Sequence, residues 1–338
     1  MKATIRDVAR EAGVSIASVS NALNGKKKVS AQTMQRIEEA AHRLGYSADP
    51  AASSLKSRNS HRIGLILPCI DSAFFPAVID ALLPILEAHG YLLSFYSTGF
   101  DPERERACVE SLLADRADGI VLDSVSTDGA YFRELSQLRM GSKRIPVVAM
   151  EQDLAQYGLS SVYVDNRAGG AMAAEHLLAC GVKHPVHIHG LRTAPWARER
   201  CEGFWQVFRE AGSGAEEART VQGDFTLQSG RLAAEELMKR GIAMDGLFAA
   251  NDLMAMGAMK ALQEAGLRIP EEIALMGFDD TSLSPLVSPS LTSIEVPKTE
   301  LGVQAGQVLL RALQSGGETA EDICLPLQLL ARQSTKTR

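Results

Sequence analysis

From residue 62 onward, short apolar runs alternate with stretches of helical periodicity, and this alternation limits the possible folds more than any other feature. Strands that alternate with helices form parallel sheets with helices on both faces. Eight runs with a break near residue 160, and helical patterns such as 228–240 and 252–265 between them, predict a body of two similar doubly wound lobes. The runs are IGLILP (63–68), YLLSFYS (91–97), DGIVLDS (118–124), PVVAM (146–150), VYVDN (162–166), PVHIHG (185–190), GLFAAND (246–252) and IALMGFDD (273–280).

The first 45 residues show a different pattern, of short helices separated by tight turns. Thr4 and Asp7 have the spacing of a capping box, and Gly13 suits the end of that first helix. Ser15 is placed to cap a second helix directly afterwards, which predicts a helix-turn-helix. A third helix is expected between Ser30 and Gly45, with Met34, Ile37, Ala40, Ala41 and Leu44 packed inward.

The outer face of the second helix carries only small side chains and one amide: Ile16, Ala17, Ser18, Ser20 and Asn21. Such a face lets a helix enter the DNA major groove, where Asn pairs with adenine and apolar groups contact thymine methyls. Lys26, Lys27 and Lys28 follow in a loop, placed to contact phosphates. The alternative is a small structural three-helix bundle with a solvated lysine loop.

The charge distribution agrees with a polyanion-binding N-terminal module. Residues 1–62 carry 11 Lys and Arg against 5 Asp and Glu, a net charge of +6. The remainder carries 24 (35 − 11) against 36 (41 − 5), a net charge of −12. A basic segment on an acidic carrier is typical of a nucleic-acid-binding module, although a solvated basic terminus has the same charge.

Length and composition exclude several classes of protein. At 338 residues, two or three domains are expected. No apolar run approaches the roughly 18 residues of a membrane span, the N-terminus has no apolar signal core, and the five cysteines are scattered without a C-x-x-C pair. We therefore expect a cytoplasmic protein with reduced thiols. Phosphate-binding, nucleophile-elbow and zinc-helix motifs are missing, so neither an enzyme nor a bound cofactor is expected.

The N-terminal residues resemble the lactose-repressor/galactose-repressor (LacI/GalR) family of bacterial transcription regulators. The matching segments are TIRDVAREAGVS, ASVSNALNG, VSAQT and LGY, and the likeness extends over essentially the whole chain. It implies a helix-turn-helix domain at 1–46, a hinge helix or linker at 47–60 and an effector-binding and dimerisation domain at 61–338. The body is implied to be of periplasmic-binding-protein type, with crossings between lobes near 160, 290 and 322. This places about 61–160 and 292–321 in the N-lobe, and about 162–289 and 323–338 in the C-lobe.

The resemblance also implies roles for residues that would contact DNA. Ile16, Ala17 and Asn21 fall on base-reading positions, and Leu55 falls where a leucine enters the minor groove. A lone apolar residue among small polar ones suits such a wedge. A hinge this short is too small to hold a helix alone, so we expect it to be disordered without DNA, with a plain linker as the alternative. The DNA-contacting residues expected are Thr4, Ser15, Ile16, Ala17, Ser18, Ser20, Asn21, Lys26, Lys28, Ser54, Leu55 and Lys56.

Ligands of open α/β sheets bind beyond the carboxyl ends of the strands, here in a cleft between the lobes. The family likeness implies ligand contacts for an aromatic pair, Arg200, Phe225 and Asp279, with the start of a core helix as the alternative role of Phe75. Asp252 is interpreted as the cap of helix 252–265, and Asp165 as fixing a crossover. Carboxylates, an arginine and aromatic faces suit a polyhydroxylated ligand. The effector-binding residues expected are Asp71, Phe74, Phe75, Asp123, Trp196, Arg200, Phe225, Asn251 and Asp279.

Four features depart from the family pattern or argue against other roles. Trp196 makes its loop bulky, so the effector chemistry is not safely inherited. Pro84 must kink or shorten the first body helix, which in the family contributes to the dimer contact. His184, His187 and His189 are clustered, but metal binding is disfavoured. The tail ARQSTKTR lacks the apolar heptads of a tetramer-forming helix.

We therefore expect a homodimeric, effector-responsive repressor that binds a palindromic operator, with a sugar or sugar derivative between its lobes. Whether that effector induces or co-represses stays open. The alternatives are a transport-type sugar-binding protein without a DNA role, and a regulator with a nucleobase co-repressor.

Overall fold

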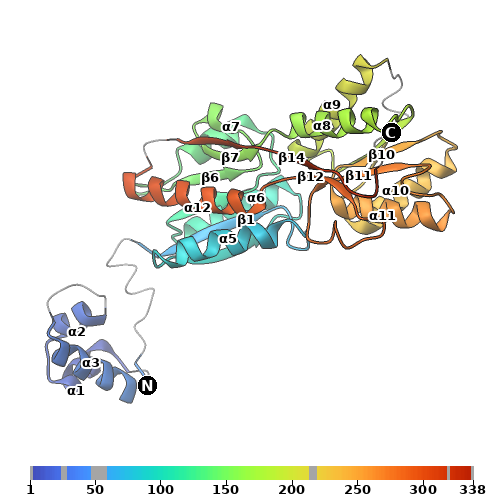
Figure 1. The fold of residues 1–338 in the computed structure, drawn as a ribbon. Helices are drawn as coiled ribbons and strands as arrows, with labels where there is room; N and C mark the ends of the chain where they lie inside the picture. The colour runs from blue at the N-terminus through green and yellow to red at the C-terminus, as the bar shows by residue number, and fades with distance from the viewer. Residues whose placement is uncertain (1–2, 24–28, 47–58, 213–218, 318–319, 336–338) are drawn as a thin grey trace. The chain divides into compact units, whose positions relative to one another are not determined.

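The computed structural model describes residues 3–23, 29–46, 59–212, 219–317 and 320–335. The chain divides into two compact units, the head (residues 1–61) and the body (residues 62–338). Figure 1 labels their helices and strands. Among the described residues, no helix combines the length and hydrophobicity that a bilayer crossing requires.

The head contains three helices, α1 (Ile5–Ala12), α2 (Ile16–Leu23) and α3 (Ala31–Arg43). The predicted capping is confirmed: Thr4 N and Oγ1 donate to Asp7 Oδ2 at 3.0 and 2.6 Å. Gly13 ends α1 at φ 65°, and Ser15 Oγ accepts from Ser18 N at 3.0 Å. Leu44, expected inside, is 36% exposed because α3 ends before it. The buried residues are Val8, Ala9, Ala12, Val19, Ala22, Ile37, Ala40 and Ala41.

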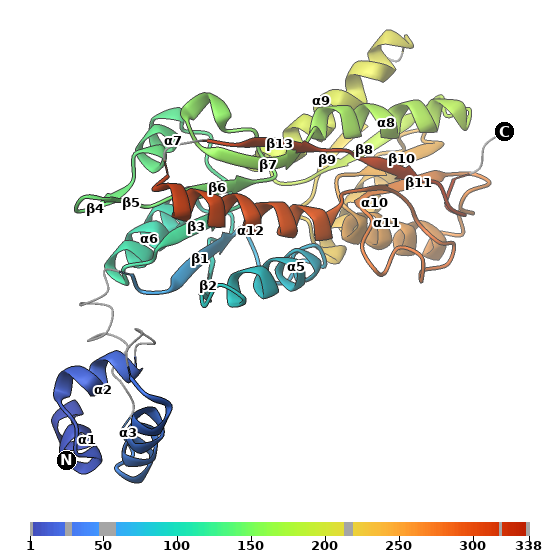
Figure 2. The same ribbon diagram turned by 60° about the vertical axis from the view of Figure 1, so that its left-hand side comes forward.

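The first lobe of the body is built on a six-stranded parallel sheet in the order β13-β7-β6-β3-β1-β2. Helices α5 and α12 lie side by side on one face, and α6 and α7 cover the other (Figures 1 and 2). The alternation along β1 explains this layering, because Leu65 packs under α5 and α12 whereas Ile66 packs under α6 and α7. The bounds are β1 (Arg62–Leu67), β2 (Leu92–Ser97), β3 (Gly119–Leu122), β6 (Val147–Met150), β7 (Ser160–Val164), β13 (Asp322–Leu325), α5 (Phe75–Glu87), α6 (Pro102–Ala114), α7 (Gly129–Ser136) and α12 (Lys298–Ser315), with the hairpin β4 (Arg139–Met140) and β5 (Lys143–Arg144) and the turn η1 (Ala155–Tyr157).

The second lobe has a six-stranded sheet in the order β14-β12-β11-β10-β8-β9, in which β14 runs antiparallel to β12 and the other pairs are parallel. Helices α8 and α9 cover one face, and α10 and α11 cover the other. The two lobes confirm the predicted fold class. The bounds are β8 (Pro185–His189), β9 (Thr220–Gln222), β10 (Gly246–Ala249), β11 (Ala274–Asp279), β12 (Thr292–Glu295), β14 (Gln328–Leu330), α8 (Asn166–Ala179), α9 (Pro195–Glu210), α10 (Leu227–Lys239) and α11 (Asp252–Glu264).

Two glycines bring α8 and α9 into close contact. A Cβ added to Gly170 would lie 2.0 Å from the carbonyl oxygen of Arg200, and one added to Gly203 would lie 1.9 Å from that of Arg167. Since no side chain fits at either position, the backbones approach directly. This contact sets the position of α9 on the sheet.

The chain crosses between the lobes later than the sequence suggested. Crossings near 160, 290 and 322 were expected. Each crossing instead follows a complete strand, namely β7, β12 or β13, which end at residues 164, 295 and 325. Residues 292–295, assigned from the sequence to the first lobe, form β12 and pair with β11 and β14 in the second sheet.

Pro84 lies inside α5 without ending it, since the helix continues to Glu87. The expected shortening is therefore wrong. Pro84 lies in the last turn of α5, and Asp80, whose carbonyl loses its helical donor, is exposed.

Candidate functional site

The carboxyl ends of both sheets face one cavity of about 410 Å³, a volume that includes space open to solvent. An outer cavity of about 860 Å³ adjoins it, because Cys69, Ser72, Phe100 and Phe225 line both. Asp71 lines the outer cavity. The remaining predicted effector-binding residues all line the inner one: Phe74, Phe75, Asp123, Trp196, Arg200, Phe225, Asn251 and Asp279. The structure thus gathers these residues, whereas their role as effector contacts stays a prediction.

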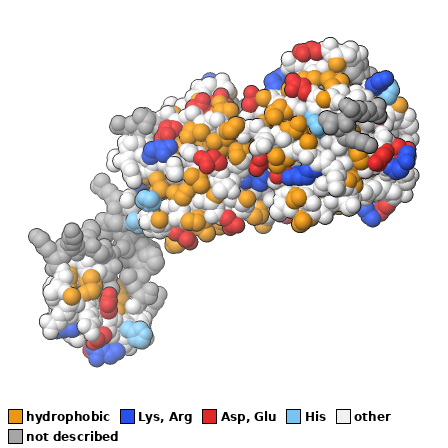
Figure 3. Space-filling model, viewed as in Figure 1, with side chains coloured by type: hydrophobic (Ala, Val, Ile, Leu, Met, Phe, Trp, Pro, Cys, Tyr) orange, Lys and Arg blue, Asp and Glu red, His pale blue; other side chains and the backbone are white. Residues whose placement is uncertain are grey.

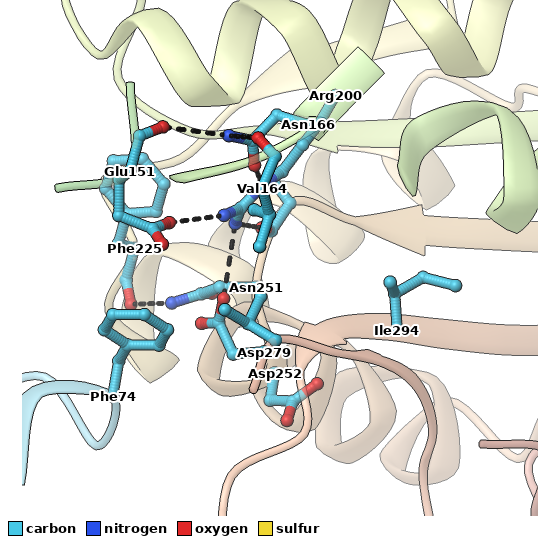
Figure 4. Close-up of polar contacts among 12 residues, drawn as sticks. Phe74, Glu151, Val164, Asn166, Arg200, Phe225, Asn251, Asp252, Asp279 and Ile294 are labelled. Carbon is cyan, nitrogen blue, oxygen red and sulfur yellow. Dashed lines mark hydrogen bonds and ion pairs between the residues drawn. The ribbon is translucent and has the colours of Figure 1, made fainter. Parts of the chain in front are cut away.

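Arg200, at the first turns of α9, is the centre of the cavity's polar network (Figure 4). Its Nε donates to Asn166 Oδ1 at 2.8 Å, and its Nη1 donates to Ala250 O at 2.8 Å and to Asp279 Oδ1 at 3.3 Å. Nη2 lies 3.5 Å from Glu151 Oε2. The guanidinium also lies over the Phe278 ring, 3.7 Å from its centroid. Because Glu151 follows β6 of the first lobe, Arg200 links the two lobes.

Burial shifts the pKa of every acid around this arginine. Burial raises the pKa of Asp279 to about 6, although Arg200 and Lys298 oppose the shift. Burial also raises the pKa of Glu151 against the same two cations. The pKa of Asp123 rises well above its usual range, because burial is reinforced by the Glu151 and Glu105 carboxylates and opposed only by Arg200. The cavity therefore holds carboxylates that resist ionisation.

Aromatic rings form the walls of the cavity. Phe100 of the first lobe stacks on Phe225 of the second, with ring centroids 5.4 Å apart and 16° between the planes. Trp196 also stacks with Phe225, with ring centroids 6.4 Å apart and 30° between the planes. Phe74 and Phe75 are buried and meet edge to face at 5.2 Å, and Phe75 also starts α5. Phe75 thus combines the core role that the sequence allowed with a place on the cavity wall.

Strained backbone is concentrated at the cavity. Among the described residues, seven other than glycine have positive φ, and four of these line the inner cavity. They are Phe100 (60°), Glu151 (65°), Phe225 (71°) and Asp279 (100°). Since such conformations cost of order 1–3 kcal/mol each and cluster at functional sites, their position favours a binding role for this cavity.

Sequence reasoning missed several members of the site, among them Glu151, Asn166 and Phe100 beside the lining residues Pro68 and Cys69. Glu151 directly follows the apolar run PVVAM, so its position at a strand end was a usable signal. Asn166 holds Arg200 from the start of α8, and Phe100 lies in the turn after β2. Neither of these two stands out by residue type or spacing.

The prediction for Asp252 is wrong, because Asn251 caps α11 and accepts from Met254 N at 2.9 Å. Asn251 Nδ2 also donates to Phe225 O at 3.0 Å, which fixes the Phe225 turn. Asp252 instead accepts from Ser284 Oγ at 2.5 Å, Ser293 Oγ at 2.6 Å and Thr281 N at 2.7 Å. It thereby anchors the loop between β11 and β12. Burial, with the nearby Asp279 carboxylate, raises the pKa of Asp252 to about 7.

The remaining predictions for the body concern Asp165 and the histidines. Asp165 Oδ1 accepts from Ala168 N at 2.8 Å and caps α8 at the crossover. His187 is buried between aromatic rings, its Nδ1 is 2.9 Å from Phe248 O, and burial lowers its pKa to about 3. His189 Nδ1 contacts Gly190 O. Within the described part of the chain, no group of three ligating side chains is arranged to hold a metal ion.

The head presents the predicted outer face of α2 to solvent. Ile16 is 47% exposed, and Ala17 and Asn21 are exposed as well, whereas Val19 is buried beneath them. Ser18 and Ser20 are half-buried, and Thr4 and Ser15 cap their helices. The predicted DNA contacts that lie outside the described residues are Lys26, Lys28, Ser54, Leu55 and Lys56.

Comparison with known proteins adds independent evidence. Residues 4–49 match the family model described as "Bacterial regulatory proteins, lacI family". Residues 147–335 match the model described as "Periplasmic binding protein-like domain". The ribose operon repressor of Halalkalibacterium halodurans is 33% identical over 98% of this chain and 97% of its own length. The repressor PurR of Klebsiella pneumoniae is 31% identical over 98% of this chain and 96% of its own.

Solved structures agree over the same length. The Lac repressor dimer bound to operator and an anti-inducer is similar with a TM-score of 0.86 and 26% identity, covering 99% of both chains. The regulator CelR in complex with cellobiose is similar with a TM-score of 0.72 and 26% identity, covering 98% of this chain and 99% of that one.

Proposed function

The chain belongs to the LacI family of bacterial regulatory proteins, and we propose that it is a repressor that binds a palindromic operator as a homodimer and responds to a small-molecule effector held between its lobes. The observation that carries this proposal is the presence on one chain of an exposed reading helix and of a strained polar cavity between two lobes.

The reading helix is α2. Ile16 and Ala17 offer apolar contacts to thymine methyls, and Asn21 offers a bidentate partner for adenine. The lysines at 26 and 28 supply phosphate contacts, and residues 54–56 supply the minor-groove wedge. One helix-turn-helix buries too little surface for tight and selective binding, so two heads related by a two-fold axis read two half-sites.

The effector site is the inner cavity. Its carboxylates accept hydrogen bonds from hydroxyl groups of the ligand, and its amide both donates and accepts them. Phe225 offers the face of its ring to a ring of the ligand. A ligand there contacts both lobes, so it changes the free energy of closing them and hence of ordering two hinge segments on DNA. A coupling of roughly 1–3 kcal/mol between the sites is typical. A sugar or sugar derivative is the proposed class, and a nucleobase is the rival.

The other proposals follow from this mechanism. The protein acts in the cytoplasm, where an operator is found, and it carries no catalytic residues. A transport-type sugar-binding protein has no use for the reading helix in the head.

The proposal is tested by selecting genomic fragments with the full-length protein at moderate salt, with and without metabolite extract. We expect one palindromic fragment to be preferred, and deletion of residues 1–60 to abolish this binding while ligand binding survives, because head and body are separate compact units. No preference among fragments, or operator binding by the body alone, contradicts the proposal.

A thermal-shift screen identifies the effector, since a ligand of the native state raises the melting temperature. The screen should include sugars, sugar acids, sugar phosphates and nucleobases. A nucleobase that binds when no sugar does replaces the proposed effector class, while leaving the repressor role intact.

A further inference from the structure

Asp123 is the acid of the inner cavity that lacks a counter-charge. Its side chain is 2% exposed, and its Oδ1 has no hydrogen-bond partner. Arg200 pairs instead with Glu151 and Asp279, at 3.5 and 3.3 Å. Within the described part of the chain, no ion pair reaches Asp123. A buried carboxylate left in this state is the kind of group that a ligand completes.

The charged groups around Asp123 do not compensate it. Glu105 of α6 is buried and accepts from Ser124 Oγ at 2.7 Å and from Val125 N at 2.8 Å. Glu151 adds a second carboxylate, and its Oε1 also has no hydrogen-bond partner. The Lys298 ammonium donates to the backbone carbonyls of Val296, Asp279 and Asp280. The first lobe thus contributes three buried carboxylates. Lys298 acts on Glu151 and Arg106 on Glu105, whereas Arg200 alone opposes the rise in the pKa of Asp123.

We propose that the effector is an organic cation, an amino-bearing ring such as an amino sugar, whose ammonium group binds between Asp123 and Glu151. This rests on the proposed function, which places the effector in this cavity. An ammonium has three donors, so it satisfies both unpartnered oxygens at once, and its positive charge favours the ionised form of acids whose pKa burial raises. The faces of Phe225 and Trp196 suit the body of a cationic ring.

The same arrangement discriminates against other ligand classes. A sugar phosphate or sugar acid brings a negative charge next to three buried carboxylates and is rejected. A neutral sugar supplies donors but leaves the charge uncompensated. A metal ion is disfavoured because, in the residues the structure describes, the acids are not grouped as a metal site.

The charge preference can be tested without knowing the natural effector. The probes are cyclohexylammonium, cyclohexanol and cyclohexanecarboxylate, which share one ring and differ in charge. Their binding to the full-length protein is measured by thermal shift and by titration at constant ionic strength. We expect cyclohexylammonium to bind, cyclohexanol to bind more weakly and cyclohexanecarboxylate to give no shift.

Asp123→Asn assigns the effect to the cavity. This substitution should weaken cyclohexylammonium binding about fivefold or more, because it removes the carboxyl group that ionises against the bound ammonium but keeps the shape. Glu110→Gln, the same charge change at an exposed position of α6, should leave binding unchanged. Circular dichroism of both variants confirms that each is folded.

Absence of cyclohexylammonium binding, equal binding of cyclohexanol, or a loss below fivefold in Asp123→Asn overturns the inference. Operator selection on the same samples separates it from the proposed function. Selective ammonium binding without operator binding contradicts the repressor role but not this inference. Operator binding without an ammonium preference contradicts this inference but not the repressor role.

Discussion

Replacing Arg200 by methionine should strongly destabilise the body. Methionine has a similar length but no charge, so Glu151 and Asp279 remain buried without their cation. With an effective dielectric constant of about 20, Arg200 attracts Asp279 at 3.3 Å and Glu151 at 3.5 Å by about 5 kcal/mol per pair. Most of this attraction offsets the free-energy cost of removing the three groups from water. Removal of one partner from such a buried set costs about 3–5 kcal/mol.

The assay is chemical and thermal unfolding followed by tryptophan fluorescence. Both tryptophans of the chain, Trp196 and Trp205, lie in α9, so the signal reports on the body alone. We expect the melting temperature of Arg200→Met to fall by about 6–20 °C, from about 2–4 °C per kcal/mol for a unit of this size. The matched control is Arg198→Met in the same helix. Arg198 is half exposed and 3.9 Å from Glu202, so its loss should cost less than about 1 kcal/mol.

The cost of Arg200→Met should also depend on pH. Because the pKa of Asp279 is raised to about 6, Asp279 loses its charge as the pH falls from 8 to 5, and the raised pKa of Glu151 acts in the same direction. The attraction lost in the variant is then smaller, so the destabilisation should shrink at low pH. A loss below about 1 kcal/mol at pH 8, or the same loss at pH 5 and pH 8, refutes the role assigned to this arginine.

Three further predictions concern separate parts of the chain. Asn21→Ala should weaken binding to the preferred operator by about 1–3 kcal/mol in a gel-shift titration while the head stays folded, and unchanged binding contradicts its base-reading role. Asp252 has a folded pKa of about 7, above its unfolded value near 3.9, so its contribution to stability is full below about pH 4 and is lost as the pH rises through 7. The free energy of unfolding of wild type relative to Asp252→Asn should therefore decline from pH 5 to pH 8, and a pH-independent difference argues against that shift. Gly170→Ala should destabilise the body by about 1–3 kcal/mol in urea unfolding, because its Cβ would lie 2.0 Å from the Arg200 carbonyl oxygen, and a neutral effect contradicts the close helix contact.

The sequence predicted most strands that are buried on both faces, and it missed three strands at sheet edges together with the buried interior strand β12. β3 and β10 are buried throughout, so they read as continuous apolar runs. β9, β13 and β14 each lie at an edge and are partly exposed, so their sequences include polar residues. Each strand is also only three or four residues long. β2 is also an edge strand, but its apolar residues Leu92 and Phe95 stay exposed, which made it visible.

Residue types at strand ends predicted most of the cavity lining, but they did not predict its hydrogen bonds. Arg200 was predicted, whereas its partner Asn166 was not, because the two meet only through the packing of α8 on α9. Asn251 and Asp252 are adjacent and equally suited to cap a helix. Asn251 has the extended backbone, with φ −151° and ψ 170°, and this conformation decides which of the two is the cap.

Net charge along the sequence located the head, but it did not reveal where the charge of the body matters. On the face of the body in Figure 3, acidic and basic side chains are interspersed with hydrophobic ones, so the negative excess forms no single patch there. The acids with unusual chemical properties are the buried ones. A count of acidic residues does not distinguish the buried Asp123 from an exposed acid such as Glu110. Burial alone makes that distinction, since an exposed carboxylate is compensated by water.

If the effector binds in this cavity as proposed, the position of Arg200 makes it act on the lobes and not only on its own pocket. Arg200 belongs to the second lobe and is held there by Asn166, Ala250 and Asp279, while Glu151 reaches it from the first. The Arg200–Glu151 contact is therefore a charge interaction between lobes, and any ligand group that binds Glu151 competes with it or adds to it. Competition favours separation of the lobes, whereas a group that binds Glu151 and Asp279 together favours closure. The sign of the response thus depends on how the ligand divides its contacts between these two carboxylates.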